Sequence, residues 1–137
     1  MSLIDQLTSP AGLRRVFWAD ALSGSATTAL HLALAGPLAA WLGLPAGLIH
    51  ASGFALLLYV VLAGSLALQA APSRAGLQLL VAGNFAWVVA CVALLLSGAL
   101  SPTPLGQAYL VVQALAVLVL AELQWMALRR QRTGAMA

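Results

Sequence analysis

The fold is decided by Leu105 to Arg130, whose sequence is LGQAYLVVQALAVLVLAELQWMALRR. As a helix, the largely apolar part from Leu105 to Leu128 would be about 36 Å long at ~1.5 Å per residue. That length exceeds the ~30 Å hydrocarbon core of a bilayer, so the stretch predicts a tilted membrane span. The span ends in a basic cluster, Arg129, Arg130 and Arg132. By the positive-inside rule this cluster marks the cytoplasmic side.

The composition of the whole chain is typical of a membrane protein. Its 137 residues are 63% hydrophobic and 7% charged, and the mean hydropathy is +1.01. A soluble domain would carry about 25% charged residues. The chain is therefore predicted to be an all-α, polytopic membrane protein with the lipid bilayer as its surroundings.

The basic residues occur only near the ends of apolar segments. The net charge of +3 and the isoelectric point near 10.0 resemble those of nucleic-acid-binding proteins. Their positions instead favour topology signals and contacts with anionic lipid headgroups, so no nucleic-acid partner is expected. The six cations are Arg14, Arg15, Arg74, Arg129, Arg130 and Arg132.

Four apolar segments with short turns predict one membrane domain over residues 1–137, an antiparallel bundle of four transmembrane helices. The spans are expected at about 17–42, 46–69, 76–100 and 105–128, with cytoplasmic flanks at 1–15 and 129–137. Because short turns make neighbouring spans antiparallel, both termini and the Pro72–Arg74 turn fall on one side with all six arginines. The predicted location is the bacterial inner membrane, with both termini cytoplasmic.

The first span is the least apolar of the four. Asp20, Thr27 and His31 lie on one face of the predicted helix, which is expected to point into the bundle because polar groups avoid lipid. The polar residues of this span are Asp20, Ser23, Ser25, Thr27, Thr28 and His31.

Both ends of the first span allow alternatives. Pro37 either kinks the helix or ends it early, leaving a short interfacial stretch to Gly43. The pair Arg14 and Arg15 also fits the start of a twin-arginine export signal. Three further membrane-length runs follow instead of a soluble passenger, which favours a retained first helix.

Three polar residues are predicted at similar depth in the cytoplasmic half of the bundle. Asp20, Asn84 and Glu122 lie within about 6 Å of one another along the membrane normal by helical rise. If they meet, they form a proton or cation site whose carboxylates exchange a proton for a substrate. The alternative is a structural hydrogen-bond cluster, in which Glu122 is held by Asn84, Ser23 or a snorkelling arginine.

A second candidate pair lies near the middle of the membrane, formed by His31 and Gln113. A histidine at this depth could ligate haem, but the only other histidine, His50, is about 10 Å nearer the periplasm. A neutral His31 bonded to Gln113, Thr27 or a backbone carbonyl is favoured. The single cysteine, Cys91, excludes a thiolate metal cluster, so no metal and no cofactor is expected.

Small residues recur along the third span at a spacing of three and four. They are Gly83, Ala86, Ala90, Ala93 and Ser97. Such a stripe lets a neighbouring helix approach closely, which is how helices associate inside a membrane. We define these five residues as the small-residue seam.

Three short motifs resemble sequences of a known group of proteins. They are Ala82-Gly83-Asn84 with Trp87, Ser101-Pro102-Thr103 with Leu105-Gly106, and Ala121-Glu122-Leu123-Gln124-Trp125 before the final arginines. Through them the chain, over about residues 17–130, resembles small, uncharacterised four-helix inner-membrane proteins of bacteria. The resemblance implies a fold and a compartment, and it supplies no activity, cofactor or site residue.

The chain carries no Gly-rich phosphate loop, no HExxH motif and no Ser/His/Asp set in a soluble context, and its loops are too short to build a site outside the membrane. The favoured hypothesis is a non-enzymatic accessory or structural component that packs, through the small-residue seam, as a homo-oligomer or with another membrane protein. The alternative is a small proton-coupled transporter acting around Glu122, Asp20 and His31. A quinone- or haem-linked enzyme is a third hypothesis.

Overall fold

The computed structural model describes residues 1–133, which contain six helices and no strand. The all-α prediction is confirmed. The last four residues of the predicted flank at 129–137 lie outside the described residues. The helices are α1 (Leu3–Thr8), α2 (Pro10–Ala33), α3 (Ala35–Leu42), α4 (Ala46–Leu68), α5 (Arg74–Leu96) and α6 (Pro104–Arg132).

Three of the helices, α4, α5 and α6, are long and apolar enough to cross a membrane, which indicates a membrane protein. Helix α2, with 24 residues, is long enough to cross a membrane but is not apolar enough to be among them. The reason is its polar content, because Asp20, His31 and several serine and threonine residues interrupt the apolar sequence. The fourth span therefore stays a prediction, and it rests on α2.

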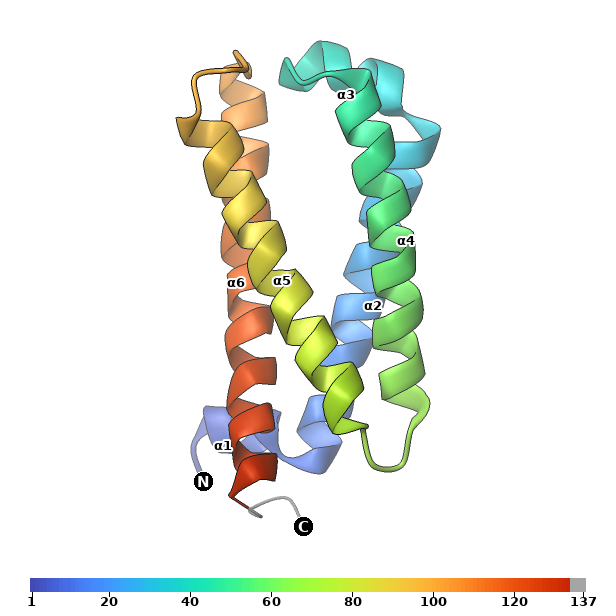
Figure 1. The fold of residues 1–137 in the computed structure, drawn as a ribbon, viewed down its shortest axis with the longest axis vertical. Helices are drawn as coiled ribbons and strands as arrows, with labels where there is room; N and C mark the ends of the chain where they lie inside the picture. Colours follow the sequence, from blue (N-terminus) through green and yellow to red (C-terminus); the bar gives the residue numbers. More distant parts are fainter. Residues whose placement is uncertain (134–137) are drawn as a thin grey trace.

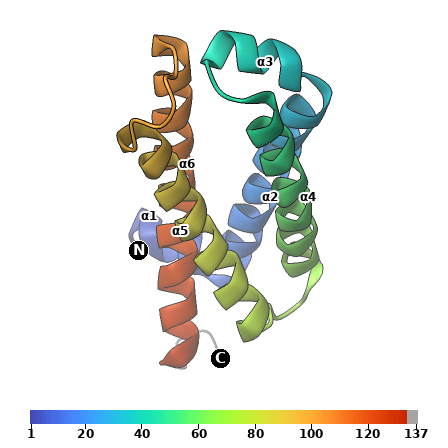
Figure 2. The same ribbon diagram turned by 45° about the horizontal axis from the view of Figure 1, so that its top comes forward.

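The predicted first span at 17–42 is divided into two helices. Helix α2 ends at Ala33, and α3 begins at Ala35 after a break at Leu34. Pro37 lies in the first turn of α3, where the missing backbone N–H is not needed. Of the two alternatives at this proline, the helix ends early, and α3 lies across the end of the bundle (Figure 2).

The four long helices form two antiparallel pairs. Helix α2 packs along α4, and α5 packs along α6, with less contact between the pairs. The pairs come together at the end that holds α1, where α5 approaches α4 (Figure 1) and α6 contacts α2. We call this the arginine end, because the six arginines lie near the beginnings of α2 and α5 and the end of α6.

Apolar side chains join the pairs at both ends of the bundle. The cluster at the arginine end draws on all four long helices and comprises Leu13, Phe17, Ala21, Ala63, Leu66, Ala67, Leu77, Leu80, Val81, Ala127 and Leu128. The cluster at the opposite end joins α3 and α4 to α5 and α6 and comprises Ala35, Leu38, Leu42, Leu44, Ile49, Cys91, Leu110 and Ala114. The buried polar side chains of Asp20 and Asn84 lie next to the first of these clusters along α2 and α5.

The turn between α5 and α6 is tied to α3 by close backbone contact. The Thr103 side chain caps α6 by accepting from the Gly106 N–H at 3.1 Å, and its hydroxyl donates to the Trp41 carbonyl at 2.6 Å. The Thr103 N–H also donates to the Leu42 carbonyl at 3.0 Å. A Cβ atom on Gly106 would collide with that carbonyl.

We expect Gly106→Ala to lower the free energy of unfolding by about 2 kcal/mol, because two backbone segments would have to separate. Titration with sodium dodecyl sulfate in mixed micelles measures it. Gly47→Ala is the matched control, since a Cβ at Gly47 meets nothing within 4 Å and alanine favours a helix. Equal stability of the two variants would contradict the expectation.

Helix α1 is held against α6 by an ion pair. The Arg130 guanidinium donates to Asp5 Oδ1 at 2.5 Å, and Asp5 Oδ2 accepts from the Ser2 N–H at 3.1 Å and the Ser2 hydroxyl at 2.7 Å. The hydrogen bond from the Ser2 side chain, followed by that from Arg130, lowers the pKa of Asp5 to about 2.

Docking of α1 is therefore expected to depend on pH. Because the pKa of Asp5 is lowered on folding, its contribution is complete above the unfolded pKa of ~3.9 and is lost as pH falls through about 2. Amide-exchange protection over Leu3–Thr8 should fall across this range. In Arg130→Gln the protection should be lower at neutral pH and should fall less on acidification. A wild-type profile identical to that of the variant would contradict the role of the ion pair.

Candidate functional site

A buried polar network connects the two helix pairs near the arginine end. Asp20 of α2 accepts hydrogen bonds at Oδ2 from Gln124 Nε2 of α6 at 2.7 Å and from Asn84 Nδ2 of α5 at 3.2 Å. Asn84 Nδ2 also lies 2.7 Å from Gln124 Oε1. All three side chains are buried. The network holds three helices together through one carboxylate oxygen.

The structure brings together two of the three residues predicted for this site. Asp20 and Asn84 meet, but Glu122 is only half-buried and makes no side-chain hydrogen bond or ion pair among residues 1–133. Gln124 takes the expected place of Glu122. Two residues along a helix turn a side chain by about 200°, so the two positions lie on nearly opposite faces of α6.

Asp20 has one oxygen that the network does not use. Both amides donate to Oδ2, and Oδ1 accepts no hydrogen bond from the described residues. Among residues 1–133, the only salt bridge is the ion pair of Arg130 with Asp5. Asp20 therefore lies in the bundle without a protein cation beside it.

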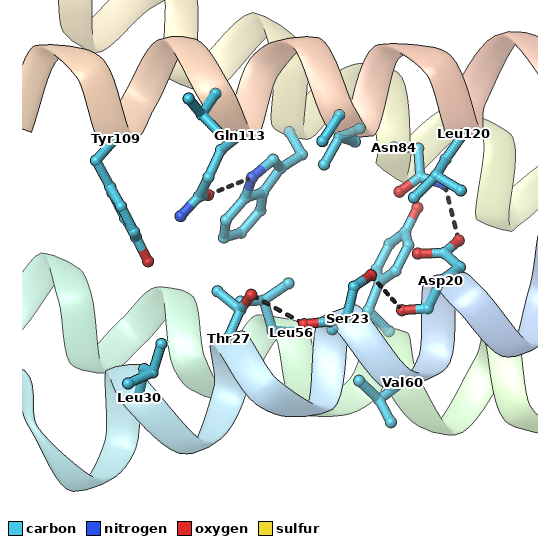
Figure 3. A pocket seen from close by; sticks show the side chains of 16 residues that line it. Asp20, Ser23, Thr27, Leu30, Leu56, Val60, Asn84, Tyr109, Gln113 and Leu120 are labelled. Carbon is cyan, nitrogen blue, oxygen red and sulfur yellow. Dashed lines mark hydrogen bonds between the residues drawn. The ribbon is translucent and has the colours of Figure 1, made fainter.

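A cavity of about 300 Å³ lies between the helix pairs, with Asp20 among its lining residues. Asp20 and Asn84 lie at one end of it, and Tyr109 and Gln113 lie at the other (Figure 3). The free oxygen of Asp20 points toward the cavity (Figure 3). From Asp20 to Leu30 the cavity follows α2 for about 15 Å by helical rise. Its walls are formed by all four long helices.

Most of the cavity wall is apolar or aromatic. The hydroxyls of Ser23 and Thr27 donate to carbonyls of their own helix, to Asp20 O at 3.2 Å and Ser23 O at 2.9 Å, so they offer no free proton. The aromatic wall residues are Tyr59, Trp87 and Tyr109, and the larger aliphatic ones are Leu30, Leu56, Val60, Val112, Val117 and Leu120. Asp20 supplies the one carboxylate in this wall.

His31 forms a second network beyond the far end of this cavity. Its Nδ1 lies 2.7 Å from Ser52 Oγ, and its Nε2 lies 2.7 Å from the Tyr109 hydroxyl. The Ser52 hydroxyl proton goes to the Ile49 carbonyl at 2.7 Å, so Ser52 accepts from Nδ1–H and Tyr109 donates to Nε2. A neutral imidazole satisfies all of these bonds.

The predicted pairing of His31 with Gln113 is not present as a hydrogen bond. Gln113 Oε1 instead accepts from Trp87 Nε1 at 3.0 Å. Both His31 and Gln113 line a smaller cavity of about 100 Å³ beside the first. The partners of His31, Ser52 and Tyr109, were missed by sequence analysis because neither is distinguishable from other hydroxyl residues in the spans.

The small-residue seam lies mainly on the outside of the molecule. Gly83 faces Tyr59, whose ring occupies the space that a Cβ would need. The Tyr59 hydroxyl donates to the carbonyl of Leu80. The other four residues of the seam, Ala86, Ala90, Ala93 and Ser97, are exposed.

Within residues 1–133, no three His, Cys, Asp or Glu side chains come together in a way that could hold a metal ion. Comparison of the chain with protein-family models, with curated proteins and with solved structures finds no match.

Proposed function

We propose that the protein spans the bacterial inner membrane four times, with α2 as the fourth span and both termini in the cytoplasm. Support comes from the arginines gathered at one end of the bundle. The polar residues of α2 are compatible with a span because Asp20 and His31 turn into the bundle, where protein groups satisfy them. Reporter fusions at the C-terminus and in the Gly43–Pro45 turn test this topology.

Within this topology the protein is a small proton-coupled transporter, and the cavity between the helix pairs is its binding site. One observation carries the proposal: a cavity walled by four helices has a buried carboxylate at one end, and no cation among residues 1–133 is paired with it. Ionisable groups inside a membrane bundle mark ion, proton or substrate paths. Of the two carboxylates named from the sequence, Asp20 and not Glu122 is the one in this cavity wall.

The coupling follows from the single free oxygen of Asp20. A proton on Oδ1 neutralises the carboxylate, whereas the ionised carboxylate attracts a polar or charged group of a solute. Proton and solute therefore compete for one atom, and binding of one releases the other. The two helix pairs meet chiefly in the apolar clusters at the ends of the bundle. Relative movement of the pairs would open the cavity to either side.

The test uses proteoliposomes that contain a pH-sensitive dye. A panel of small aromatic solutes of different charge is added outside, and the internal pH is followed. At least one solute should move protons with the wild type and not with Ala116→Phe, whose larger side chain fills the cavity. A response no greater than that of protein-free vesicles for the whole panel would contradict a transporter.

The accessory or structural role is the second candidate, and the outward position of the seam favours it. Ala86, Ala90 and Ala93 expose a flat surface on α5 that a helix of another protein or a second copy could approach closely. If the role is correct, Ala90→Leu should disrupt an assembly seen by native mass spectrometry. The control is Val89→Leu, because Val89 is exposed on the same helix but outside the seam.

A further inference from the structure

The geometry points to a small organic monocation as the solute, in which an ammonium group is attached to a compact aromatic or branched apolar body. This inference rests on the proposed function, since it names the class of molecule that the Asp20 cavity takes. It depends on the charge, the wall chemistry, the size and the access of the cavity, which are independent observations.

The charge of the cavity is negative whenever Asp20 is ionised. No arginine, lysine or histidine is among the lining residues. Asn84 and Gln124 use their amide groups on each other and on Oδ2, so they hold the carboxylate in place without neutralising it. An anionic solute would meet an uncompensated negative charge in a medium that screens poorly. A cation completes an ion pair that the protein lacks.

The wall beyond the carboxylate suits an alkylated ammonium better than a hydrated metal ion. Tyr59 and Trp87 supply aromatic rings, and aromatic faces attract quaternary ammonium groups. Most of the remaining wall is aliphatic, including Val112 and Leu120, and Asp20 supplies its only carboxylate, whereas a small inorganic cation requires several oxygen ligands. A volume of about 300 Å³ is at the lower limit of ligand pockets, which favours a compact solute.

The cavity is also open toward the side of the bundle. Leu30 on α2 and Val112 on α6 both line it and are exposed, with 43% and 65% of their surface accessible. In a bilayer these residues face the acyl chains. An amphiphilic cation that partitions into the membrane therefore has a lateral route to Asp20, whereas a strongly hydrated solute does not.

The test is direct binding of tritiated benzyltrimethylammonium to the full chain in lipid nanodiscs. We expect one saturable site with affinity about tenfold weaker in Asp20→Asn, which keeps the shape and removes the charge. Ala116→Phe should lose binding by filling the cavity, and Glu122→Gln should retain it. Wild-type binding should weaken as the pH is lowered, because protons compete for the carboxylate. The titratable group that faces Asp20 is the Tyr59 phenol, since Asn84 and Gln124 are neutral amides.

Competition with benzyl alcohol separates this inference from the proposed function. If the neutral alcohol competes as strongly as the unlabelled cation and Asp20→Asn binds normally, the cavity takes apolar solutes and the cationic class is wrong. If the cation does not bind but another solute moves protons in the vesicle assay, the transporter remains and the cationic class is again wrong. Failure of both assays overturns both proposals. If Asp20→Asn does not fold, the pH dependence of wild-type binding tests the role of the carboxylate, and Ala116→Phe tests the position of the site.

Discussion

Asp20→Asn is expected to abolish solute-driven proton movement, and Glu122→Gln is expected to leave it nearly unchanged. Asparagine has the shape of aspartate, and its amide oxygen still accepts the hydrogen bonds from Asn84 and Gln124. It cannot bind or release a proton near neutral pH. The variant therefore removes the exchanged proton while it keeps the connection among α2, α5 and α6.

The expected loss in the coupled rate is at least about a hundredfold, because no other carboxylate lines the cavity. The measurement is the initial rate of internal pH change in proteoliposomes at equal protein content. Glu122 is the matched control, since it is an acid in the same bundle that lies outside the Asp20 network. A loss with Glu122→Gln and normal coupling in Asp20→Asn would assign the proton to Glu122 and refute the cavity site.

The choice between Glu122 and Asp20 shows what the sequence could and could not predict. Helical rise gave the depth of each polar residue, and Asp20 and Asn84 do meet at the predicted level. Depth alone does not fix the direction of a side chain around the helix axis. The buried positions Ala121, Gln124 and Leu128 follow three- and four-residue spacing on α6. This spacing places Gln124 inside and turns Glu122 away.

The division of the first span has a similar explanation. The sequence contained the correct alternative at Pro37, but local chemistry does not say whether a proline kinks a helix or follows its end. The position of the helix end depends on contacts that are distant in sequence, because the Leu42 and Trp41 carbonyls at the end of α3 accept hydrogen bonds from Thr103. The same limit applies to His31, whose partner Tyr109 lies 78 residues along the chain.

Phe17→Ala is expected to have the largest effect on stability, about 3 kcal/mol in the free energy of unfolding. The ring is fully buried in the cluster at the arginine end, where residues of α2, α4, α5 and α6 surround it. Lipid is as apolar as this cluster, so the loss comes from missing packing contacts and not from hydration. The cavity left by the ring would lie where the two pairs are joined.

Titration with sodium dodecyl sulfate in mixed micelles measures this loss, with Leu22→Ala as the control on the same helix. Leu22 is 66% exposed, so its truncation should change the free energy by less than about 0.5 kcal/mol. The position of Phe17 also predicts a functional effect, because the cluster that joins the pairs lies next to Asp20, three residues along α2. Weaker packing in this cluster should separate Asp20 from Gln124. Binding of the solute should then weaken together with the free energy of unfolding. If both variants unfold at the same detergent fraction, the pairs are not held together by this cluster. The polar network of Asp20, Asn84 and Gln124 would then be the principal connection between them.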